Sequence, residues 1–202
     1  NNTAVGTSAL TANTTGTANT AVGCGALVAN TTADFNTAIG TCSMLTNITG
    51  EENTAVGFNS LKTSTVSNNT AFGSQSLRGT TTGANNTAVG RDAMKANTTG
   101  TQNTAIGADA LIATTTGDDN TALGFCALRS NTTASDNTAL GRKSLQANTT
   151  GANNSAVGLN ALFSNTTGAC NVAVGLSALE TNSTASNNTA VGKDALKANT
   201  TG

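Results

Sequence analysis

The chain has 202 residues, a formal net charge of −1 and no His, Trp, Tyr or Pro. Leu, Ile, Val and Phe together number 34, a content as low as in disordered proteins, yet disorder also requires a high net charge, which is absent here. Without His, Ser-His and Cys-His catalytic arrangements are impossible, so we expect no enzyme and no cofactor. The nine basic residues are spread along the chain and predict no DNA or RNA binding, and no apolar run is long enough to insert into a membrane.

One 17-residue unit, with consensus NTAVGxxALxxNTTGxx, is written twelve times, apart from one unit of 16 residues between Gly57 and Gly73. A fixed period in this range is the sequence signature of a solenoid. Residues 1–202 therefore read as a single repeat domain. Since solenoids need atypical capping units and none is visible, we expect an excerpt of a longer fibre protein.

Each unit predicts its elements in the same chain order. The Asn-Thr-Ala-Val run alternates at period two, which is typical of a short strand with Thr and Val on one face and Asn and Ala on the other. The glycine that follows suits a corner, and recurrent Gly, Thr and Asn disfavour a helix. The later NTTG segment reads as a second short strand or a turn. The prediction is an all-β fold, a parallel β-solenoid (β-roll) of twelve coils.

Stacked coils place equal positions of the unit about 4.8 Å apart in vertical columns. The aliphatic column before the glycine and the Leu column four after it are predicted as two internal ridges. The invariant Ala column is predicted as an outer methyl surface that contacts partner chains, which makes the protein a homo-oligomer. The invariant Asn column is predicted as a structural amide ladder; its members are Asn2, Asn19, Asn36, Asn53, Asn69, Asn86, Asn103, Asn120, Asn137, Asn154, Asn171 and Asn188.

The unit NTAVGxxAL, as in residues 86–94, resembles the head-domain repeat of trimeric autotransporter adhesins and the similar repeats of phage tail fibres. The resemblance covers all twelve units, although the unit here is longer in its NTTG segment. It implies a left-handed β-roll, a side-by-side homotrimer, and display outside the cell, on a cell surface or on a virion. The implied function is a structural or adhesive fibre segment, with filament formation end to end as a further expectation.

Variable columns are the candidates for recognition of a host-surface receptor or glycan, because the invariant columns are committed to structure. The position after the corner glycine carries the candidate residues Phe58, Arg91, Phe125, Arg142, Leu159, Leu176 and Lys193. The acidic pairs Glu51-Glu52 and Asp118-Asp119 are read as solvated loop charges, and no metal site is expected. The four cysteines, Cys24, Cys42, Cys126 and Cys170, are expected to be free thiols.

An alternative function is ice binding. The columns eight and nine positions after the glycine are mostly Thr, and regular Thr or Asn arrays on a β-solenoid are what ice-binding proteins present. Adjacent Thr14 and Thr15 would point in opposite directions, which counts against such an array.

Overall fold

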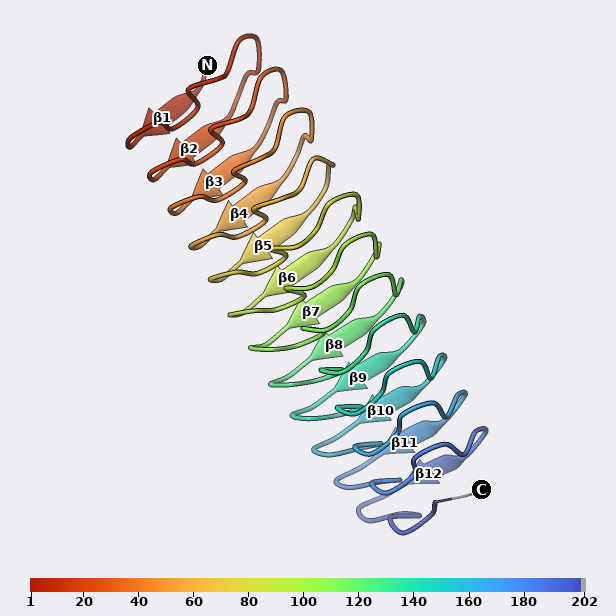
Figure 1. Ribbon diagram of the computed structural model, residues 1–202. Coiled ribbons are helices and arrows are strands. Elements are labelled where there is room, and N and C mark those ends of the chain that lie inside the picture. Colours follow the sequence, from red (N-terminus) through yellow and green to blue (C-terminus); the bar gives the residue numbers. More distant parts are fainter. Residues whose placement is uncertain (201–202) are drawn as a thin grey trace.

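The computed structural model describes residues 1–200 and consists of one parallel sheet wound by successive turns of the chain (Figure 1). No helix occurs among these residues, and the sheet order follows the chain from the first strand to the twelfth. The strands are β1 Thr3–Val5, β2 Thr20–Val22, β3 Thr37–Ile39, β4 Thr54–Val56, β5 Thr70–Phe72, β6 Thr87–Val89, β7 Thr104–Ile106, β8 Thr121–Leu123, β9 Thr138–Leu140, β10 Ser155–Val157, β11 Val172–Val174 and β12 Thr189–Val191. The predicted all-β parallel β-solenoid is confirmed, and residues 201–202 of the expected repeat domain lie outside the described residues.

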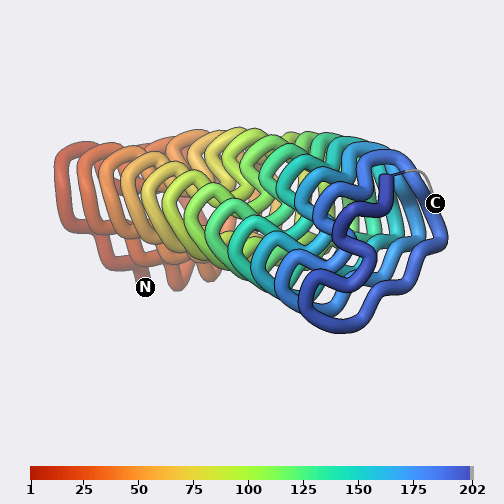
Figure 2. The backbone as a smooth tube through the Cα atoms, turned by 90° about the horizontal axis from the view of Figure 1, so that it is seen from below, coloured from red at the N-terminus to blue at the C-terminus, as the bar shows by residue number. Residues whose placement is uncertain are grey.

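Equal positions of the repeat lie directly above one another. Thr3 pairs with Thr20 at the start of the sheet, and Thr54 pairs with Thr70 across the 16-residue unit, so the register survives the missing residue. Seen along its length, the solenoid is a stack of similar coils, each slightly offset from the one before (Figure 2). The vertical columns assumed from the sequence therefore exist in the structure.

The corner after each strand requires glycine for two reasons, as Gly107 illustrates. Its φ of +136° lies in a region that L side chains rarely adopt. A Cβ built on Gly107 would also lie 2.5 Å from the carbonyl oxygen of Gly124 in the next coil. The coils therefore touch backbone to backbone at this corner.

The interior differs from the predicted one. The Leu column is inside, with Leu111 and Met94 fully buried. The aliphatic column before the glycine is outside, however, since Phe72 is 53 % exposed and Ile106 is 39 % exposed. The Ala column is buried, as Ala105 with 0 % exposure shows, so the prediction of an outer Ala surface for partner chains is wrong.

The small space inside each coil explains why the Ala column is buried and the larger aliphatic column is exposed. Each coil provides one large interior side chain, such as Leu111, and the facing positions hold the methyl groups of Ala105 and Ala110. A second large aliphatic per coil would overfill so thin an interior, and overpacking costs typically 1–3 kcal/mol per site. The strand therefore turns its Ala face inward and its Thr and Val face outward.

The NTTG segment forms a turn with no strand of its own. Its backbone still bonds to the next coil, since the amides of Thr98 and Thr99 both donate to the carbonyl of Thr115. In the short unit, one residue is missing at this corner, and the carbonyl of Val66 accepts the Asn53 amide at 2.9 Å, where the preceding coil uses Gly50.

Candidate functional site

The invariant Asn side chains form an inner ladder along the solenoid. The Oδ1 of Asn120 accepts the backbone N–H of Asn137 at 3.1 Å and its side-chain amide at 3.3 Å. The Nδ2 of Asn120 donates to Asn103 Oδ1 at 3.0 Å and to the Ala134 carbonyl at 2.9 Å, which belongs to a corner of the same coil. Asn103, Asn120 and Asn137 are fully buried. Asn120 thus ties its own strand to both neighbouring strands and closes its own coil.

A second column of Asn, seven positions after the glycine, forms a further ladder. Asn148 donates to Asn131 Oδ1 at 3.0 Å, and Asn165 donates to Asn148 Oδ1 at 2.9 Å. The column is interrupted at Ser64, Thr80 and Thr114. Recurrent Asn at this position is the signal in the sequence for this second ladder.

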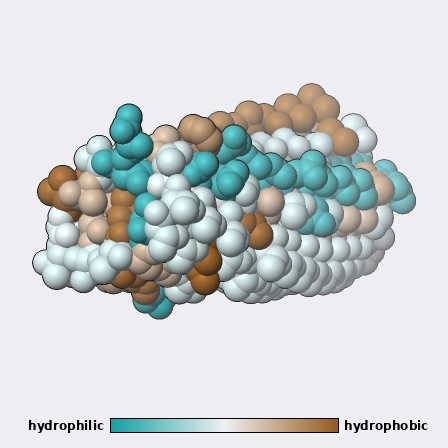
Figure 3. Space-filling view, turned by 90° about the horizontal axis from the view of Figure 1, so that it is seen from above, coloured by the Kyte–Doolittle hydropathy of each residue, from teal (hydrophilic) through white to brown (hydrophobic). Residues whose placement is uncertain are grey.

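The outward face of the sheet carries an apolar column that we call the outer row. Its members are half-buried or exposed, because the strand points them away from the interior. Apolar side chains gather in a row along one edge of the solenoid in the view of Figure 3. The outer row consists of Val5, Val22, Ile39, Val56, Phe72, Val89, Ile106, Leu123, Leu140, Val157, Val174 and Val191.

The candidate recognition residues lie at the corner next to the outer row. Their side chains are exposed or half-exposed: Phe125 is 44 % exposed, and the Lys193 side chain is 72 % exposed. The structure stacks Phe125, Arg142, Leu159, Leu176 and Lys193 in five successive coils, with the Arg142 guanidinium 5.9 Å from the Phe125 ring centre. The remaining two candidates, Phe58 and Arg91, are separated from this run by one or more coils.

Arg91 forms ion pairs with two acidic neighbours. Its guanidinium pairs with the carboxylate of Asp92, which follows it in the chain, and with Asp109 of the next coil at 3.1 Å. The side chain of Asp92 is almost fully buried, and Lys95 also pairs with it at 3.1 Å. Arg91 is therefore less free to meet a partner than Arg142, for which the described residues provide no ion pair.

The residues of the two acidic pairs differ in their contacts, and not all of them are solvated loop charges. Asp118 accepts the backbone N–H of Thr101 at 2.6 Å and its hydroxyl at 3.0 Å, so this carboxylate caps the coil before it. Asp119, Glu51 and Glu52 are exposed. Within residues 1–200, no group of three or more acidic or Cys side chains is placed to hold a metal ion.

The four cysteines are free thiols in different surroundings. Cys24 and Cys170 are exposed, Cys42 is half-buried and Cys126 is buried. Burial is the main cause that raises the pKa of the Cys126 thiol, and the carboxylate of Asp109 adds to it.

The Thr columns of the turn divide into two types. Thr98 and Thr115, eight positions after the glycine, donate their hydroxyls to the carbonyls of the next coil at 2.9 and 3.1 Å. In the neighbouring column, every Thr within residues 1–200 is exposed, Thr99 and Thr116 among them. Only one of the two adjacent columns therefore presents its hydroxyls to solvent.

No protein-family model, no curated protein and no solved structure matches this chain. Within residues 1–200, the structure has no helix that could cross a membrane.

Proposed function

We propose that this chain is a structural and adhesive segment of an extracellular fibre, displayed on a cell surface or a virion, with no catalytic role. The observation that carries this proposal is the outer row, which runs along the whole stack beside columns that vary from coil to coil. The invariant columns of the repeat build a rod, and the variable column after the glycine is free to contact a target. The likeness of the repeat to trimeric autotransporter heads and phage tail fibres supports the same role.

The partner of the outer row is a second copy of this chain. The outer row has one apolar side chain per coil. A partner surface can contact every member only if its own side chains repeat at the same spacing along the rod, and another copy of the solenoid has that spacing. Burying half of a Val or Leu side chain contributes about 1 kcal/mol, so twelve members contribute on the order of 10 kcal/mol. This is comparable with the 4–15 kcal/mol that association costs, so the whole row is needed.

The charges around the coil favour a closed ring of copies. Six of the ten acidic residues lie in the two positions immediately before the inner Asn ladder, at the corner that precedes each strand. All nine basic residues lie within the five positions that follow the corner glycine, together with the other four acidic residues, so this segment is positive on balance. The corner before the strand is therefore acidic, and the segment after the strand is basic. One copy can place its acidic corner against the basic segment of the next, and such heterologous contacts close into rings, of which the left-handed side-by-side trimer of the resembled family is one.

The test is the mass of the purified protein by light scattering after size exclusion. The expected result is a species of three chains for the unaltered protein and a monomer for the triple variant Ile106→Ser, Leu123→Ser and Leu140→Ser. A control with Thr99→Ser and Thr116→Ser changes exposed residues away from the outer row and should leave the mass unchanged. Far-UV circular dichroism checks that the triple variant keeps its fold. A monomeric unaltered protein at all concentrations would refute the assembly.

Ice binding is a second candidate, now placed on a different surface. The position of Thr87 holds Thr or Ser in eleven of the twelve coils, the position of Val89 is aliphatic in eleven, and the Thr87 hydroxyl forms no hydrogen bond with any residue in the range 1–200. A flat sheet with one hydroxyl and one aliphatic group per coil could order water. A thermal hysteresis measurement separates the two functions: clear hysteresis that Thr87→Leu together with Thr104→Leu abolishes would favour ice binding over the fibre role.

A further inference from the structure

The solenoid brings basic side chains from separate units into one column, five positions after the corner glycine. Lys62, Arg78 and Lys95 occupy this position in three successive coils, and Arg129 follows after an intervening Ile112. We call these four basic residues the basic column.

Hydrogen bonds between neighbouring coils hold successive members of the basic column one coil apart. The Gly79 amide donates to the Lys95 carbonyl at 2.9 Å, and the Thr63 hydroxyl donates to the Arg78 carbonyl at 2.8 Å. Successive members are therefore one coil apart, roughly 4.8 Å. Arg78 is exposed, and Lys62 is half-buried.

Few negative charges neutralise this column. Lys95 pairs with Asp92, whereas Lys62, Arg78 and Arg129 form no ion pair with any residue in the range 1–200. Like charges in neighbouring coils repel one another. The stack thus holds an uncompensated repulsion that an external anion would relieve.

The same position near the end of the solenoid shows the neutralised arrangement. Glu180 and Lys197 occupy it in the last two coils, and they pair at 3.2 Å. This pairing raises the pKa of Lys197, for which the hydrogen bond to Glu180 is the main cause. Lys197 also pairs with Asp194 at 3.3 Å, as Lys95 does with Asp92, but within residues 1–200 neither Lys62 nor Arg78 has a carboxylate partner.

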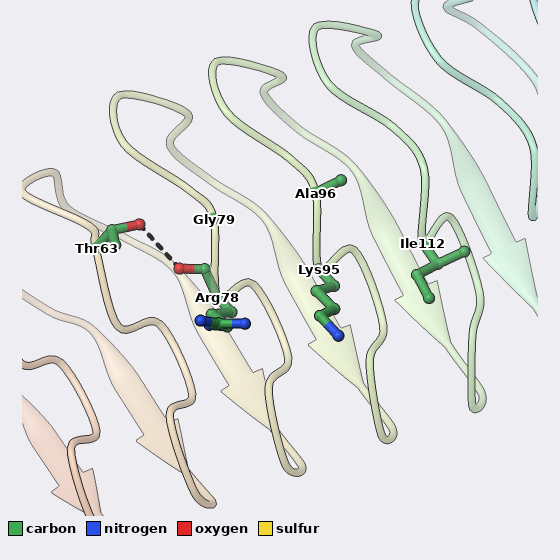
Figure 4. Close-up of a pocket in the computed structure, with 6 residues that line it drawn as sticks. All are labelled: Thr63, Arg78, Gly79, Lys95, Ala96 and Ile112. Atoms are coloured by element: carbon green, nitrogen blue, oxygen red, sulfur yellow. Dashed lines mark hydrogen bonds between the residues drawn. The ribbon is translucent and has the colours of Figure 1, made fainter.

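An open groove of about 500 Å³ lies beside the basic column, lined by Thr63, Arg78, Gly79, Lys95, Ala96 and Ile112. Figure 4 shows the side chains of Arg78 and Lys95 extending from neighbouring coils, with Gly79, Ala96 and Ile112 around them. Gly79 and Ala96 occupy the same column of the repeat in neighbouring coils and present no large side chain to the groove. The floor is thus small and apolar, and the charges stand along one side.

We propose that this groove binds a linear acidic polysaccharide with one carboxylate on each sugar residue. A polymer of this kind has a regular row of single negative charges, and its sugar rings have apolar faces that fit a floor of Gly79, Ala96 and Ile112. Single-stranded nucleic acid is less well suited, because its bases require aromatic stacking platforms and no aromatic side chain lines the groove. The inference rests on the proposed fibre role, since it names the ligand class to which such a fibre attaches.

The test uses oligogalacturonate as the probe and its methyl ester as the uncharged control, with binding measured by calorimetry at low salt. The unaltered protein should bind oligogalacturonate, lose affinity as salt increases, and bind the ester at least tenfold more weakly. The double variant Lys62→Gln and Arg78→Gln should lose at least tenfold in affinity. Lys143→Gln removes one positive charge outside both the basic column and the candidate recognition residues, and should change affinity less than twofold.

Three results would overturn this inference: absence of binding to oligogalacturonate, equal binding of the ester, or unchanged binding by the double variant. Tighter binding of a single-stranded oligonucleotide of equal charge would replace the polysaccharide with nucleic acid. Light scattering on the same samples reports assembly separately, so a trimer that ignores oligogalacturonate rejects only the ligand, and a monomer rejects the fibre assembly.

Discussion

Replacing Gly107 by Ala tests the backbone contact between coils at the corner after the strand. The substitution places a methyl carbon 2.5 Å from the carbonyl oxygen of Gly124 and 2.7 Å from its carbon. It also forces an L side chain into a φ of +136°. Neither effect can be relieved by a side-chain rotation, because both partners are backbone.

The expected loss is the sum of two contributions. A residue held in a region of φ that is open only to Gly costs about 1–3 kcal/mol. Moving the Gly124 carbonyl also disturbs the hydrogen bond that it accepts from the Ala127 amide at 3.2 Å, and a hydrogen bond of this type is worth about 1 kcal/mol. Together with the displacement of the coil, Gly107→Ala should destabilise its neighbourhood by about 3–5 kcal/mol, which is large for a single methyl group.

Two other glycines provide matched controls. Gly192 has a similar φ of +122°, but a Cβ there would meet nothing within 4 Å, so Gly192→Ala isolates the backbone strain. Gly25 has a φ of +67°, and its Cβ would lie 3.5 Å from the nearest atom, in Leu45. Gly25→Ala should cost about 1–2 kcal/mol, the ordinary cost of a left-handed residue.

Native-state hydrogen exchange is the suitable assay, since a repeat array need not unfold in one step. In Gly107→Ala, amides of β6, β7 and β8 should lose protection, while those of β1 and β2 should change little. The loss of amide protection should be largest for Gly107→Ala and smaller for Gly192→Ala and Gly25→Ala. If Gly107→Ala and Gly25→Ala cost the same, the contact between the coils is not what makes glycine necessary.

Three further predictions concern single side chains. Asn120→Ala removes a buried amide that bonds to two neighbouring coils, so it should lower the free energy of unfolding by about 2–4 kcal/mol in urea titrations. Thr114→Asn should raise it by about 1 kcal/mol, because the buried Oδ1 of Asn97 has no hydrogen-bond partner and a new amide in the next coil would supply one. A disulfide exchange reagent should modify Cys126 much more slowly than Cys24 at neutral pH, because burial and a raised pKa keep the Cys126 thiol protonated; equal rates would contradict the buried position.

The fold itself was predictable because the period of the sequence dictates it. A glycine at every seventeenth position except in one 16-residue unit, an invariant Asn and an invariant Ala impose vertical neighbours of the same type. Parallel pairing of like with like, as between Ala88 and Ala105, then follows without any long-range guess. The register survived even the short unit, since the strand and its corner are unchanged there.

The inward and outward faces of the strand were assigned the wrong way round, although the sequence held the signal. The Ala column never varies, while the column before the glycine ranges from Val to Phe72 in volume. A tightly packed interior does not accept that range, so variation in size indicates exposure. Hydrophobicity alone therefore does not tell a buried column from an exposed one in this repeat, whereas tolerance of different side-chain sizes does.

Two features could not be obtained from the repeat alone. Leu111 has a φ of +49° and Asp109 a φ of +58°, and similar values recur at these positions in the other coils. Only the frequent Asn and Asp at the position of Asp109 indicated left-handed backbone; Leu gives no such indication. The basic column was also missed, because residues 16 or 17 apart look dispersed along the chain and become neighbours only when the coils stack.

The 16-residue unit shows where this architecture tolerates change in length. With one residue fewer, the corner still offers a carbonyl, that of Val66, to the buried amide of Asn53, and the strands on both sides keep their partners. The corner therefore takes up differences in segment length that would shift the register of a strand. Insertions for new contacts can accumulate at this one edge while the rest of the rod remains unaltered.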